Sequence, residues 1–127
     1  MENFSTKTGK FSFKERAESF VHAGRGIKIF IKKTHNAWIQ IIVFVAVVFL
    51  GFYLRITNSE WVELIFAGGL VIVAEAFNSS IEIDIDLTSP GYHPYARDTK
   101  DVAAGAVLIA SCVAVAIGIL IFGHYLI

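Results

Sequence analysis

Four polar side chains, Glu75, Asn78, Glu82 and Asp86, follow an apolar stretch of the chain at regular spacing. In an α-helix, offsets of 3, 7 and 11 residues return to nearly one face, so the row is predicted to share a face. Glutamate and aspartate offer hard oxygen ligands, which suit Mg²⁺ far better than zinc or copper. The row is therefore a candidate site for a hard metal ion.

Two cations, Arg97 and Lys100, and a further acid, Asp101, follow the row closely. Lysine and arginine side chains hold phosphates, and acidic metal ligands beside cations are the minimum for phosphoryl transfer. Glu75 lies next to the apolar stretch, where it could accept the proton of a lipid hydroxyl as a general base. Neither GxxxxGK[ST] nor the protein-kinase signatures occur, which excludes the familiar soluble nucleotide sites.

Each of these residues also has an ordinary structural interpretation. Glu75 could be a hydrogen-bonded packing residue, and Asn78 could be an amide that joins two helices. Asp98 is more readily a helix cap than a ligand, and Asp84 falls off the Glu75 face. The residues alone therefore predict a membrane protein with an acidic site. They leave open a lipid kinase, a non-catalytic nucleotide- or metal-binding protein, and an ion- or proton-conducting oligomer.

The composition identifies the kind of scaffold that must position the row. The chain has 127 residues, of which 55% are hydrophobic, and a mean hydropathy of +0.62. These values are typical of a small polytopic membrane protein. We predict an all-α membrane protein with one domain over residues 1–127 and no nucleic-acid partner. It would have a mobile tail at 1–10, an amphipathic interfacial helix at 11–34, and transmembrane helices at 37–56, 61–86 and 99–126.

The amphipathic helix is predicted from one apolar face opposite a charged one, as in helices that lie in the membrane interface. The apolar face comprises Phe13, Ala17, Phe20, Gly24, Ile27 and Ile31. Asn58 or Ser59 is expected to cap the second span, and Pro90 and Pro94 are expected in the loop after it. The run from Asp98 to Asp101 resembles the capped start of the third span.

Charge asymmetry predicts the orientation. Residues 1–36 carry eight Lys or Arg against three Glu, and an excess of cations marks the cytoplasmic side. Three spans place the interfacial helix and the loop at 86–101 on that same side. The polar row would then open toward the compartment that holds ATP.

The segment from Glu75 to Val107 closely resembles the prokaryotic diacylglycerol kinase family, which includes the undecaprenol kinases of Gram-positive bacteria. The family pattern is E-x-x-N-[ST]-[AS]-I-E-x-x-x-D, a loop with a Tyr-His pair, then K-D and a helix of small residues. Here it reads Glu75, Asn78, Ser79, Ser80, Ile81, Glu82, Asp86, Tyr92, His93, Lys100 and Asp101. Phe20, Ala23 and Gly26 match the family's F-x-x-A-x-x-G, and the resemblance covers about residues 12–120.

The resemblance implies a homotrimer in the bacterial plasma (inner) membrane, with cytoplasmic active sites at subunit boundaries. Such enzymes use ATP and Mg²⁺ to phosphorylate a lipid alcohol, here diacylglycerol or undecaprenol, in phospholipid or cell-envelope lipid metabolism. By position, Glu75 matches the catalytic base and Asn78 a polar active-site residue. Glu82 matches a metal-binding glutamate near the nucleotide, and the remaining matches are nucleotide-site residues: Asp86, Lys100 and Asp101.

The chain departs from the family pattern just before the first span. Family members commonly carry E-x-N-x-R-I-H where this chain runs from Thr34 to Gln40. The glutamate that helps to hold metal is Thr34 here, and the arginine is Trp38. A neutral hydroxyl at Thr34 implies weaker metal binding or the loss of a second metal. The segment KDVAAGAV that starts at Lys100 looks more like the undecaprenol-kinase branch.

Overall fold

A computed structural model describes residues 9–127, and this part of the chain forms helices and no strand. The elements are α1 (Phe13–Lys33), α2 (His35–Leu54), α3 (Asn58–Thr88) and α4 (Pro94–Leu126). The last three are long and apolar enough to cross a membrane, which confirms the predicted all-α membrane class. Residues 1–8 of the predicted mobile tail lie outside the described residues.

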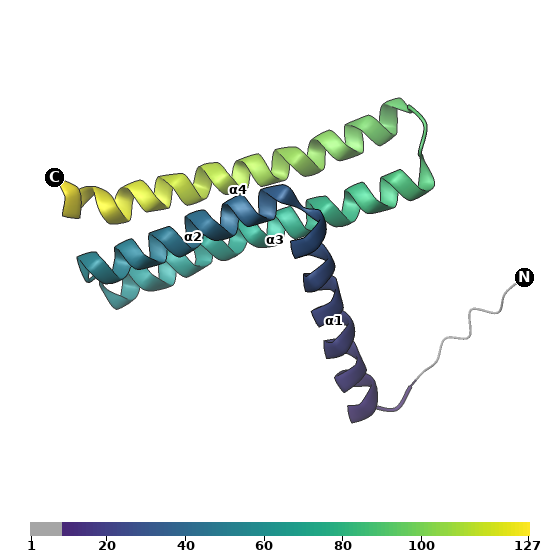
Figure 1. The fold of residues 1–127 in the computed structure, drawn as a ribbon, viewed down its shortest axis with the longest axis horizontal. Coiled ribbons are helices and arrows are strands. Elements are labelled where there is room, and N and C mark those ends of the chain that lie inside the picture. The colour runs from purple at the N-terminus through teal and green to yellow at the C-terminus, as the bar shows by residue number, and fades with distance from the viewer. Residues whose placement is uncertain (1–8) are drawn as a thin grey trace, which may run out of the picture.

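Helix α1 extends away from the bundle that α2, α3 and α4 form (Figure 1). The side chain of Ser12 caps its first turn by accepting a hydrogen bond from the backbone N–H of Glu15. None of its residues is buried, and Phe13, Phe20 and Ile27 of the predicted apolar face are all exposed. An uncovered apolar stripe of this kind is suited to lie against lipid.

The turn between α2 and α3 differs from the predicted one. Helix α2 ends at Leu54 because Arg55 adopts the left-handed conformation, with φ 53°. Thr57, and neither Asn58 nor Ser59, is the cap of α3. Thr57 accepts from the backbone of Glu60 while the Glu60 carboxylate accepts from the backbone of Thr57. This reciprocal pair satisfies two otherwise free N–H groups, which explains why the helix starts earlier than residue 61.

Helix α4 also begins earlier than predicted, at Pro94 instead of residue 99. Proline lacks a backbone N–H and is favourable at the first helical position, where no partner is available. His93 is the cap, and its Nδ1 accepts from the backbone N–H of Tyr95 at 3.1 Å. The expected placement of Pro94 in the loop and the expected cap at Asp98 are therefore wrong.

Helix α3 packs most extensively on α4, and the polar row begins on its packed face. Its buried positions are spaced by three and four residues: Leu64, Ala67, Val71, Glu75 and Asn78. Helix α4 meets this face with alanines at intervals of seven, namely Ala96, Ala103 and Ala110, which let two backbones approach closely. A cluster of large apolar side chains closes the other end of the bundle: Ile56, Leu64, Ile121 and Phe122.

Candidate active site

Glu75 is buried in the bundle, with 2% of its surface exposed. Its Oε2 accepts a hydrogen bond of 3.2 Å from Nε2 of Gln40, which comes from α2. The predicted row therefore does begin inside the protein, at a point where α2 and α3 face each other. A carboxylate in such a place is costly, which makes a functional role the first hypothesis.

Asn78 lies one turn nearer the helix end and is also buried, with 8% exposed. Its Nδ2 donates to Oε1 of Glu82 at 3.2 Å, so the amide joins the next member of the row. Its Oδ1 is buried and has no hydrogen-bond partner within residues 9–127. The side-chain hydrogen bond of Asn78 thus stays within α3, and its amide oxygen is left unpartnered among the described residues.

A cavity of about 450 Å³ lies between α1 and α3 at this end of the bundle. Thr34, Glu82 and Asp86 line it, together with Lys33 and Ser79. Thr34 lies between α1 and α2, and its hydroxyl is hydrogen-bonded to the Ser79 hydroxyl at 2.9 Å. The structure thus places Thr34 in the same cavity as the two acids, where the family pattern would put a third carboxylate.

A second cavity, of about 300 Å³, lies beside the loop between α3 and α4. Asp86 lines this cavity as well, together with Lys100 and Asp101. Lys100 forms an ion pair with Asp86 that joins α4 to the end of α3. Asp86 therefore connects the two cavities, and all three predicted nucleotide-site residues from this region meet here.

The loop cation Arg97 is already engaged inside the chain. Its guanidinium pairs with Asp98 at 3.0 Å and donates to the hydroxyl of Tyr92 at 3.2 Å. Asp98, expected as a cap, instead pairs with this arginine. Arg97 borders the second cavity, so its charge still adds to that of Lys100 there.

The donor set fits magnesium bound together with a phosphate-bearing substrate. Within residues 9–127, no three His, Cys, Asp or Glu side chains form a complete metal site by themselves. Mg²⁺ in nucleotide sites is commonly held by one or two carboxylates plus substrate phosphates and water. Glu82, Asp86 and the unpartnered Oδ1 of Asn78 could supply such a partial shell.

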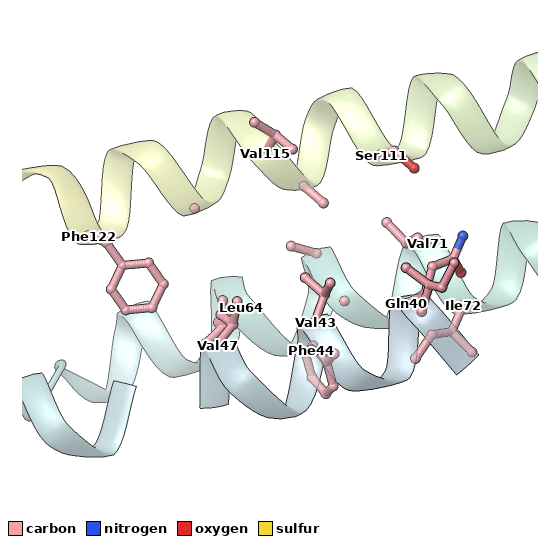
Figure 2. Close-up of a pocket in the computed structure, with 15 residues that line it drawn as sticks. Gln40, Val43, Phe44, Val47, Leu64, Val71, Ile72, Ser111, Val115 and Phe122 are labelled. Atoms are coloured by element: carbon pink, nitrogen blue, oxygen red, sulfur yellow. The ribbon is translucent and has the colours of Figure 1, made fainter. Parts of the chain in front are cut away.

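An apolar groove of about 290 Å³ runs between α4 and the pair α2 and α3 (Figure 2). In Figure 2, Gln40 lies at the opposite end of the groove from Phe122, with Ser111 facing it from α4. Val71, one turn before Glu75, is also in the wall. The groove therefore leads along the apolar interior to the amide that holds Glu75.

Glu75 itself does not line the two polar cavities or the groove. Its carboxyl group contacts Gln40 on one side and lies one helical turn from Asn78 and Ser79 on the other.

Gln40 was missing from the predicted site. Its signal in the sequence is a lone amide in the uncharged stretch 37–54, but its contact with Glu75 spans 35 positions and no local spacing predicts it.

Comparisons with known proteins agree on one class. Residues 21–122 match the model of the family described as prokaryotic diacylglycerol kinase. An undecaprenol kinase of Bacillus subtilis is 36% identical over 105 residues, covering 83% of this chain and 85% of that protein. A diacylglycerol kinase of Helicobacter pylori is 31% identical over an alignment of 133 positions, covering 99% and 95% of the two chains. A diacylglycerol kinase of Synechocystis is 34% identical over 101 residues, covering 79% of this chain and 58% of that protein.

Proposed function

Because this chain belongs to the prokaryotic diacylglycerol kinase family and is thus a membrane lipid kinase, we propose that it transfers a phosphoryl group from ATP to a lipid hydroxyl. Glu75 is proposed to be the general base of this transfer. The lipid O–H bond breaks and its proton goes to the Glu75 carboxylate. The lipid oxygen bonds to the γ-phosphorus, and the bond between that phosphorus and the bridging oxygen breaks. ADP leaves with the electron pair.

The observation that supports this function best is the position of Glu75 between two different environments. On one side, Gln40 connects it to an apolar groove that suits a hydrocarbon chain. On the other side, Asn78 and Glu82 lead from it to cavities lined by acids and by Lys100. A lipid alcohol in the groove and a nucleotide phosphate in the polar cavities would therefore come near Glu75 from two different sides.

The chain's own residues divide the remaining work. Lys100, Asp86 and Asp101 would hold the nucleotide, with the Lys100 ammonium against its phosphates. Asn78, Glu82 and Asp86 would hold Mg²⁺, which neutralises phosphate charge when it is bound. Thr34 contributes only a hydroxyl that already pairs with Ser79, so we propose a single tightly held metal.

The lipid is proposed to be diacylglycerol or undecaprenol, with a preference for undecaprenol from the KDVAAGAV segment. The protein is proposed to lie in the bacterial inner membrane with its N-terminus and the polar row in the cytoplasm. A homotrimer is proposed as well, in which neighbouring subunits close the two polar cavities. Cross-linking in native membranes would reveal a trimer by its mass, and a monomer would refute this arrangement.

A substrate panel tests the function. Purified protein in mixed micelles is given Mg²⁺ and ATP labelled at the γ-phosphate, with diacylglycerol, undecaprenol or no added lipid. We expect label in the phosphate of at least one lipid alcohol and a dependence on Mg²⁺. If neither lipid is labelled with Mg²⁺ or Mn²⁺ present, the proposed reaction is wrong.

A second candidate is a non-catalytic member of the same fold that binds nucleotide or metal. The observation in its favour is Thr34, which stands where the family pattern has a metal-binding glutamate and is hydrogen-bonded to Ser79. This candidate predicts saturable ATP binding by the purified protein with no labelled lipid in the same panel.

A further inference from the structure

Gln40 is the only side-chain amide in the uncharged stretch from Ala37 to Leu54. Its Nε2 donates to Oε2 of Glu75 at 3.2 Å. Its Oε1 is buried and has no hydrogen-bond partner in the part of the chain that the structure describes. Water does not satisfy polar groups in the hydrocarbon region, so a half-satisfied amide is unfavourable there. The NH₂ group of this amide is engaged with Glu75, and its carbonyl oxygen has no partner among the described residues.

The direction of the amide follows from this hydrogen bond. Nε2 belongs to the NH₂ group of Gln40, so that group faces Glu75. The carbonyl oxygen is then turned away from Glu75. The same bond occupies Oε2 of Glu75 and leaves its Oε1 as the free basic atom.

Gln40 also belongs to the wall of the apolar groove between α2, α3 and α4. The residues around it in that wall are apolar, among them Ile39, Val43 and Ile72. Figure 2 shows its amide at the end of the groove away from Phe122. A hydroxyl that travels at the head of a hydrocarbon chain in this groove therefore meets the Gln40 amide next to Glu75.

We propose that Gln40 is the positioning residue for Glu75 and the first contact of the lipid hydroxyl. Its Nε2 holds one oxygen of Glu75, so that the other oxygen points toward the incoming hydroxyl. Its Oε1 accepts the hydrogen of that hydroxyl on arrival, before Glu75 removes it. This inference rests on the proposed lipid-kinase function and adds a residue and a direction of approach to it.

The test compares three substitutions of Gln40 in the full-length protein in mixed micelles. Gln40→Met and Gln40→Leu remove both polar atoms with two different shapes, and Gln40→His restores one N–H donor. We expect kcat to fall by about 10- to 100-fold for the methionine and leucine variants, since the hydrogen bond to the Glu75 carboxyl group is lost. The histidine variant should recover much of that loss, and KM for ATP should stay within about twofold in all three.

Val45→Met is the matched control, because Val45 lies on the same helix outside the groove and both polar cavities, is exposed, and has no hydrogen-bonding atom in its side chain. It should leave kcat unchanged. If Gln40→Met fails to fold, the leucine and histidine variants decide the question. Equal kcat for wild type and Gln40→Leu, or equal losses for Gln40→Leu and Gln40→His, would overturn the proposal. A wild-type protein that labels no lipid would instead overturn the proposed function itself.

Discussion

Replacing Glu75 by glutamine removes the proposed base with the least disturbance of its surroundings. Glutamine has nearly the same shape, and its carbonyl oxygen can still accept the hydrogen bond from Gln40 Nε2. Only 2% of Glu75 is exposed, so solvent water is poorly placed to replace it as base. A general base contributes about 10²- to 10⁴-fold, which corresponds to about 2.7 to 5.4 kcal/mol in the activation free energy.

We therefore expect Glu75→Gln to lower kcat by about 10²- to 10⁴-fold. The dissociation constant for ATP should hardly change, because Lys100 and Asp86 lie on the far side of Asn78 and Glu82. The assay is initial-rate lipid phosphorylation, beside ATP binding measured on the same preparation. A loss of less than about threefold in kcat would refute the base assignment, and a parallel loss of ATP binding would point to misfolding instead.

Three other substitutions test the surroundings of Glu75. Lys100→Met should raise KM for ATP by roughly three- to tenfold with a smaller change in KM for lipid, since an exposed cation contributes modestly to phosphate binding. An unchanged KM for ATP would show that Lys100 does not belong to the nucleotide site. Thr34→Glu should tighten Mn²⁺ binding in the presence of ATP, because it adds a third carboxylate to the cavity that Glu82 and Asp86 line. The dissociation constant for Mn²⁺ is measured by titration. An unchanged constant would refute the proposal that the hydroxyl of Thr34 limits the site to a single metal ion. Gly118→Leu should raise KM for lipid by roughly fivefold, because the new side chain fills the groove. Gly123→Leu is the control: Gly123 lies outside the groove with equal room for a side chain, so KM for lipid should not change. Equal effects of the two substitutions would show that the groove does not hold the lipid.

Local periodicity explains how much of the fold could be predicted. The spacing of the apolar and polar residues is a property of single helices, so the all-α class and the three spans were predictable from it. The face shared by Glu75 and Asn78 was predictable for the same reason, and both are buried. The family pattern then indicated Lys100 and Asp86, which do form an ion pair.

The helix ends were harder to predict because several residues compete as caps. Thr57 was missed because Asn58 and Ser59 are equally good caps by residue type, and only the reciprocal bonds with Glu60 distinguish them. Pro94 was misplaced because proline both ends helices and starts them. In each case the sequence allows more than one position, and the hydrogen bonds of the folded chain decide between them.

The hydrogen bonds between distant segments could not be predicted from local spacing. Gln40 meets Glu75 across 35 positions, and Thr34 meets Ser79 across 45. Both contacts depend on how α2 approaches α3, which no spacing within one helix determines. The hydrogen bond between Gln40 and Glu75 is consequently visible only in the folded chain.

In the proposed reaction, Glu75 is the one carboxylate that joins a lipid hydroxyl to a nucleotide phosphate. The most direct test counts lipid phosphate and ADP formed in the same sample of purified protein, with wild type beside Glu75→Gln. The proposed reaction predicts one lipid phosphate for each ADP from wild type, and very little of either from the variant. ADP formed without lipid phosphate, or equal yields from the two proteins, would contradict it.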